Sequence, residues 1–128
     1  MKKSIEQDIQ KLNSIIRSLT NIKKAFEQSG IANANSLKRD EITQAACTQF
    51  ITNIHEDKKK LQDGTLSKLV ELNEIDLIVT RNIASHDYDN LNFQIVYSLC
   101  KRLIKSAIIA ETYLVLAEVE QMEGVQYD

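Results

Sequence analysis

Hydrophobic residues recur at intervals of three and four along most of this chain, the spacing that gathers them on one side of an α-helix. The pattern is clearest near the amino terminus, where it predicts a helix from about Lys2 to Ser29 that ends at Gly30. Its apolar positions are Ile5, Ile9, Leu12, Ile16, Leu19, Ile22 and Phe26. Charged and amide side chains occupy the opposite side, so this helix should bury one face.

A second helix is predicted from about Leu37 to Gln62, after a small polar loop in which Asn35 or Ser36 can cap its start. Its expected buried positions are Ile42, Ala46, Phe50, Ile54 and Leu61. It ends in a charged run, residues 55–60. We interpret this run as a solvent-exposed helix end, because the repeated His or Cys ligands of a zinc site are absent.

A third helix is predicted from Thr65, a plausible N-cap, to about Ser85, and the pair Asn73–Glu74 could divide it. Its wide apolar face suggests that it is the central helix. The apolar positions are Leu66, Leu69, Val70, Leu72, Ile75, Ile78, Val79 and Ile83.

The fourth predicted helix follows the cap-rich residues 89–92 and runs from about Phe93 to Met122. One apolar row resembles a heptad pattern and consists of Phe93, Val96, Cys100, Leu103, Ala107, Ala110, Leu114 and Ala117. A second row widens this face and consists of Leu99, Ile104, Ile108, Val115 and Val119. The small alanines would allow a neighbouring helix to approach closely.

These four elements predict an all-α fold, a single domain over residues 1–128. The expected architecture is an up-and-down antiparallel bundle of four principal helices with short loops. The absence of proline and the presence of only three glycines favour long uninterrupted helices and argue against a sandwich or barrel.

The formal net charge is −2, so binding to nucleic acid would have to come from a local basic patch. Lys101, Arg102 and Lys105 are the candidate RNA contacts, with Lys58 to Lys60 as a second run, although both runs can equally be solvated helix faces. We find neither a signal peptide nor an apolar stretch of membrane-spanning length, so we expect a cytoplasmic protein with no membrane partner. The two cysteines, Cys47 and Cys100, are too far apart in the sequence to suggest a disulfide framework, and we expect reduced, mostly buried thiols.

One octapeptide between the third and fourth predicted helices combines residue types that carry chemistry. It reads Arg-Asn-Ile-Ala-Ser-His-Asp-Tyr over residues 81–88, an R-x4-H-x-Y pattern. Asn82 and His86 are four residues apart and share a helix face, whereas Arg81 and His86 are about 140° apart on an ideal helix. The arginine and histidine therefore converge only if the helix ends or loosens near Ser85, with Tyr88 just beyond.

The chemistry that these residue types support is metal-free cleavage of RNA. Histidine can accept and donate a proton near neutral pH. An arginine fork can hold a phosphate and stabilise the charge that develops on it during attack by the RNA 2′-hydroxyl. A histidine at a helix end can also cap the last carbonyls of the helix, so a purely structural role is the alternative to a catalytic role for His86.

The octapeptide and its position before a long fourth helix resemble the signature of HEPN-domain proteins, specifically the HepT-like toxins of nucleotidyltransferase-linked toxin–antitoxin pairs. The resemblance covers the chain in length and helix order, and its specific part is confined to residues 81–88. It implies a homodimer whose two motif copies face one cleft. It also implies metal-independent endoribonuclease activity without a cofactor, with Arg81 and His86 as catalytic residues and Asn82 in the polar position after the arginine. A nucleotidyltransferase antitoxin would transfer AMP to Tyr88.

Two alternatives stay open. The chain could be a non-catalytic module that binds a nucleotidyltransferase partner and uses the motif only as an AMP acceptor or dimer contact. It could also be a purely structural helical module. Other enzyme classes are poor competitors, because phosphate-binding glycine loops, H-E-x-x-H and Cys–His clusters are missing from the sequence.

Overall fold

The computed structural model describes residues 3–77 and 92–126, with side chains as far as residue 123, and its secondary structure in these ranges is helical without any strand. The expected all-α class is therefore confirmed. The helices are α1 (Ile5–Gln28), α2 (Ala34–Lys38), α3 (Glu41–Lys59), α4 (Asp63–Leu66), α5 (Val70–Asn73), α7 (Phe93–Leu103) and α8 (Ser106–Gln126).

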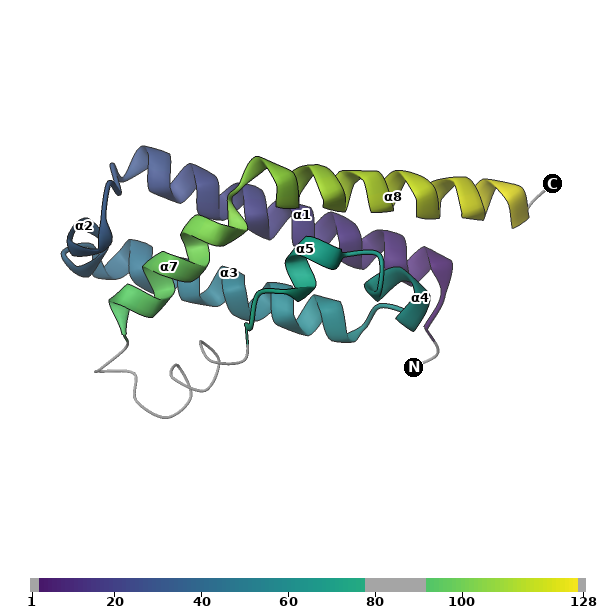
Figure 1. Ribbon diagram of the computed structural model, residues 1–128, viewed down its shortest axis with the longest axis horizontal. Helices are drawn as coiled ribbons and strands as arrows, with labels where there is room; N and C mark the ends of the chain where they lie inside the picture. The colour runs from purple at the N-terminus through teal and green to yellow at the C-terminus, as the bar shows by residue number, and fades with distance from the viewer. Residues whose placement is uncertain (1–2, 78–91, 127–128) are drawn as a thin grey trace.

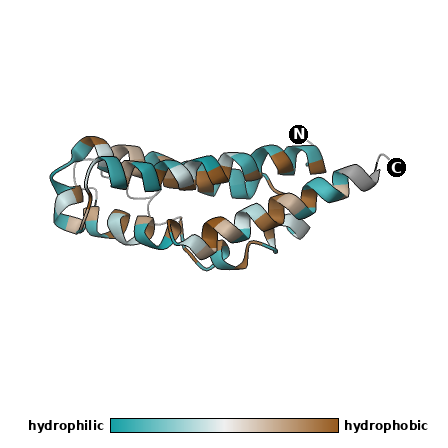
Figure 2. Ribbon diagram, turned by 90° about the horizontal axis from the view of Figure 1, so that it is seen from above, coloured by the Kyte–Doolittle hydropathy of each residue, from teal (hydrophilic) through white to brown (hydrophobic). Residues whose placement is uncertain are grey.

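Helix α1 lies between α3 and α8, and both of these helices run in the direction opposite to α1 (Figure 1). Helix α7 packs against α2 and α3, and the short α5 packs against α8. Polar and apolar residues alternate along the helices, as expected for helices that bury one side (Figure 2). None of the described helices has the length and apolarity needed to cross a membrane.

The prediction for α1 is confirmed over most of its length. Its buried apolar residues are Leu12, Ile15, Ile16, Leu19, Ile22 and Phe26. Ser4 begins the helix, because its hydroxyl accepts a hydrogen bond of 3.1 Å from the amide of Gln7. Gly30 ends it with a φ of +63°, a conformation that glycine adopts without steric cost.

The prediction of one uninterrupted second helix is wrong. Asn33 caps the short α2, and Asp40 caps α3 by accepting a hydrogen bond of 3.0 Å from the amide of Thr43. Thr43 faces inward and shares a 2.9 Å hydrogen bond with the hydroxyl of Ser29, so the adjacent Ile42 is turned outward and is 84% exposed. The buried positions of α3 are Thr43, Cys47, Thr48, Ile51, Ile54 and Asp57.

The third predicted helix is also divided in its described part. Helix α5 ends at Asn73, which confirms the suggested break after that residue, but the preceding residues form a separate α4. Thr65 does not act as an N-cap, because it lies inside α4 and is buried. The rest of that prediction, residues 78–85, falls outside the described residues.

The fourth predicted helix breaks at Ile104, which is the C-cap of α7. The break changes which row of residues faces the core. Leu103 on α7 is fully buried, as predicted, but Leu114 on α8 is 67% exposed, and the alanines of the same row are exposed too. On α8 the second predicted row faces the core instead, since Ile108, Val115 and Val119 are buried.

Candidate functional site

The four motif residues, Arg81, Asn82, His86 and Tyr88, lie outside the described residues. We call residues 78–91, which carry them, the motif segment. The described residues on either side of it, Leu77 and Asn92, have defined contacts. On the amino-terminal side Leu77 is 2% exposed. On the carboxyl-terminal side, the side-chain oxygen of Asn92 accepts hydrogen bonds from the first amides of α7 at 3.0 and 3.3 Å, as the cap-rich sequence predicted.

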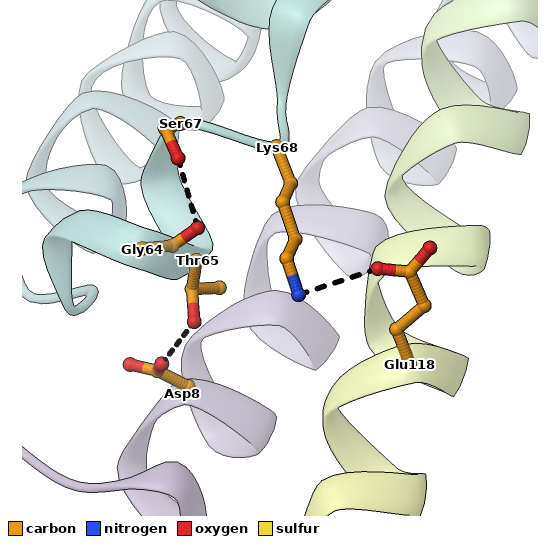
Figure 3. Close-up of polar contacts among 6 residues, drawn as sticks. All are labelled: Asp8, Gly64, Thr65, Ser67, Lys68 and Glu118. Atoms are coloured by element: carbon orange, nitrogen blue, oxygen red, sulfur yellow. Dashed lines mark hydrogen bonds and ion pairs between the residues drawn. The ribbon is translucent and has the colours of Figure 1, made fainter.

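A buried carboxylate fixes the helices that lead to Leu77. Asp8 of α1 is fully buried and accepts hydrogen bonds from the backbone amide of Gln62 at 3.0 Å, from its side-chain amide at 2.9 Å and from the hydroxyl of Thr65 at 2.5 Å. The bond from Thr65 is drawn in Figure 3. These donors satisfy the buried charge and tie the start of α4 to α1.

Two carboxylates of α8 hold the same region from the other side. The amide of Glu71, in the first turn of α5, donates to the carboxylate of Glu111 at 3.0 and 3.2 Å. The ammonium of Lys68 lies 3.3 Å from the carboxylate of Glu118 (Figure 3). The path from α4 to Leu77 is therefore attached to both α1 and α8.

Helix α7, which follows the motif segment in the sequence, is attached to α1 and to α2 with its preceding loop. The hydroxyl of Tyr97 donates to the carbonyl of Ala32 at 3.2 Å, and its ring lies 5.9 Å from that of Phe26. The ammonium of Lys38 lies 5.2 Å from the centre of the Phe93 ring, within the range of a cation–π contact.

The candidate RNA contacts Lys101, Arg102 and Lys105 are all exposed, the first two in the last turn of α7. Helical rise places Lys101 about 14 Å along α7 from Asn92, where the motif segment ends. Lys101 and Arg102 therefore lie at the opposite end of α7 from its N-cap, Asn92.

The second basic run is not simply the solvated helix end that we expected. Asp57 is buried and accepts a 2.6 Å hydrogen bond from the hydroxyl of Ser14. Burial lowers the pKa of Lys58, and the carboxylate of Asp76 partly offsets this effect. Lys59 and Lys60 line a surface cavity of about 470 Å³ with residues of α1 and the segment before it. Its lining residues belong to the start of α1 and the end of α3. In Figure 1 these two helix ends lie at the opposite end of the molecule from α2.

Cys47 on α3 and Cys100 on α7 come from two helices that pack against each other, which no pattern in the sequence indicates. Both are free and fully buried, as expected, and their interaction lowers the pKa of Cys47 and raises that of Cys100. Burial of each cysteine is predictable from the sequence, but their pairing is not, because they are 53 residues apart and meet only through the packing of α3 against α7. Among the side chains that the structure describes, no group of three or more His, Cys, Asp or Glu residues could hold a metal ion.

The fold and the described surroundings define an all-helical protein in which a segment with an R-x4-H-x-Y motif joins two parts that are each tied to α1. Comparisons of the chain with models of protein families, with curated proteins and with solved structures give no match.

Proposed function

We propose that this chain is a HEPN-type, HepT-like toxin that cleaves RNA without a metal ion and acts in the cytoplasm. The observation that carries the proposal is the R-x4-H-x-Y octapeptide of residues 81–88, placed directly before α7 in an all-helical chain. The flanking structure supports it, because both ends of the motif segment are fixed by buried or capping contacts.

In the proposed mechanism, His86 accepts the proton of an RNA 2′-hydroxyl, and the resulting oxygen attacks the adjacent phosphorus. The bond from phosphorus to the 5′-oxygen breaks, and that oxygen takes up a proton as it leaves. Arg81 stabilises the negative charge on the phosphoryl oxygens during the transfer. The products are a 2′,3′-cyclic phosphate and a 5′-hydroxyl, and none of these steps requires a metal ion.

The proposal includes regulation by a partner. A nucleotidyltransferase antitoxin would attach AMP to the hydroxyl of Tyr88, two residues after the catalytic histidine. The added phosphate brings negative charge and bulk next to Arg81 and His86, so it would repel the RNA backbone.

The proposal also includes the expected quaternary structure: each chain is an up-and-down helical bundle, and two chains form a homodimer. The exposed row of α8, formed by Ala107, Ala110, Leu114 and Ala117, offers an apolar stripe on which a second copy can pack. An antiparallel pair of α8 helices would place Lys105 of one copy near the acidic carboxyl-terminal half of the other, which contains Glu118.

Light scattering of Leu114→Glu tests this dimer. We expect the variant to be a monomer where the wild type is a dimer; a variant that remains a dimer would show that α8 does not form the dimer contact.

A non-catalytic role is the second candidate, because Asp87 and Asp89 flank the histidine region with negative charge that opposes phosphate binding. In that case the chain would bind the nucleotidyltransferase and accept AMP at Tyr88 without cutting RNA.

A cleavage assay separates the two candidates. Purified protein is incubated with fluorescent structured and unstructured RNAs in the presence of EDTA. We expect cleavage by the wild type and none by Arg81→Ala or His86→Ala, with unchanged helical circular dichroism. The other histidine of the chain gives a matched control, since His55→Ala should retain cleavage. Intact wild-type protein that binds the transferase but leaves both RNAs uncut would support the non-catalytic role.

Regulation is tested by co-expression with a candidate transferase and intact-mass measurement. We expect AMP on the wild type, none on Tyr88→Phe and the wild-type result for Tyr113→Phe, which removes an exposed tyrosine hydroxyl on α8. Modification of Tyr88→Phe at the wild-type level would exclude Tyr88 as the acceptor.

A further inference from the structure

Two cysteines from distant parts of the sequence meet inside the protein. Cys47 lies on α3 and Cys100 on α7, both side chains are 0% exposed, and the two helices pack against each other. The two thiols lie near enough for each to shift the pKa of the other. From this arrangement we infer that Cys47 and Cys100 are an oxidisable pair that closes to a disulfide between α3 and α7 when the protein meets a peroxide.

The interaction between the thiols gives the two sulfurs different roles. The neighbouring Cys100 thiol lowers the pKa of Cys47, and the same interaction together with burial raises the pKa of Cys100. Cys47 is therefore the sulfur that more readily becomes a thiolate and attacks. Cys100 keeps its proton until the second step.

The reaction balances with hydrogen peroxide as the oxidant. The Cys47 thiolate attacks one peroxide oxygen, the O–O bond breaks, and a sulfenic acid forms while hydroxide leaves and takes up a proton to become water. The Cys100 sulfur then attacks the Cys47 sulfur, and its proton leaves with the displaced hydroxyl group as a second water. The two thiols together lose two protons and two electrons, and one peroxide takes them up to become two waters.

Burial sets the rate of this reaction. Helix α7 has 11 residues and ends at Leu103, and its C-cap Ile104 interrupts the helical run before α8 begins at Ser106. A short helix with a break behind it can separate from α3 while α1 remains packed on α3 and α8. We expect oxidation in the folded protein to be slower than in the denatured chain, and to accelerate under mild urea that opens α7.

The test begins with the unaltered protein. Folded protein is treated with a small excess of hydrogen peroxide, quenched, and analysed by intact mass and by peptide mapping without reduction. We expect a loss of two hydrogens per chain, one linked peptide pair containing Cys47 and Cys100, reversal by dithiothreitol, and a higher thermal midpoint for the oxidised form. Oxygen added to separate cysteines, disulfides only between chains, or no reaction in mild urea while the fully denatured chain is oxidised would overturn the proposal.

Single variants test the assigned roles. Cys100→Ala should stop at a sulfenic acid on Cys47 that dimedone traps, whereas Cys47→Ala should leave Cys100 largely unreacted under the same conditions. Equal trapping in both variants, with circular dichroism like that of the wild type, would refute the order of the steps. The proposal goes beyond the ribonuclease function and does not depend on it, because none of these measurements uses RNA or the motif residues.

Discussion

Replacing Asp8 should destabilise the protein more than any exposed acidic substitution, because its carboxylate is fully buried and accepts three hydrogen bonds. In Asp8→Ala the backbone amide of Gln62, its side-chain amide and the hydroxyl of Thr65 lose their acceptor. Water can reach the half-buried side chain of Gln62 most easily, so the amide and the hydroxyl should carry most of the cost.

The magnitude follows from those two donors. A buried donor left without a partner costs about 1–3 kcal/mol, so the pair predicts a loss of about 2–6 kcal/mol in the free energy of unfolding. For a chain of this length, the middle of that range corresponds to a thermal midpoint lowered by roughly 10–20 °C. A double-mutant cycle with Thr65→Val should give a coupling energy of about 1–2 kcal/mol between the two side chains, because they share one hydrogen bond.

Urea unfolding followed by far-ultraviolet circular dichroism measures these differences. Asp63→Ala is the matched control, since it removes an exposed carboxylate at the start of the same α4 helix and should cost less than about 1 kcal/mol. Equal unfolding midpoints for Asp8→Ala and the wild type, or an equal loss in the control, would refute the role assigned to Asp8.

Three further predictions address α3 and the basic residues. Ile42→Lys should change the free energy of unfolding by less than about 0.5 kcal/mol, whereas Ile51→Ala should lower it by about 2–5 kcal/mol; urea titration of both tests the observed register of α3, and the reverse ranking would contradict it. The backbone hydrogen bond that Asp40 accepts lowers its pKa below the ordinary 3.8, so its stabilising contribution is present above pH 3.8 and is lost as the pH falls through the lower folded value. Thermal midpoints of the wild type and Asp40→Ala should therefore differ at pH 7 and converge on acidification; a gap that widens in acid would contradict this sign. Lys101→Glu should weaken RNA binding at low salt in fluorescence anisotropy, whereas the matched Lys23→Glu on α1 should not; equal weakening would show that only net charge matters.

Local signals in the sequence were sufficient to predict α1. Its apolar row is continuous, and Gly30 is an unambiguous end signal. The capping of α7 by Asn92 and the end of α5 at Asn73 were also predictable, because each depends on residues next to the helix end.

The divisions of the other helices depend on contacts between residues far apart in the sequence. Nothing near Thr65 indicates that Asp8, 57 residues earlier, would draw it into the interior. The break at Ile104 contains neither glycine nor proline, and α8 has apolar residues on several sides, so periodicity alone could not choose which row would face the core. The motif, by contrast, was recognisable only as a pattern of residue types, and its assignment still rests on the sequence.

The attachment of α5 to α8 has a consequence for mutational screens. Glu111 and Glu118 belong to α8, yet they hold Glu71 and Lys68, which precede the first motif residue by 10 and 13 positions in the sequence. We expect a selection for inactive variants to recover changes on α8 and at Asp8 alongside changes in the octapeptide itself. Inactive variants outside residues 81–88 would identify residues that stabilise the fold around the motif. A second substitution that restores stability should restore activity in these variants, but not in variants that lack a catalytic side chain.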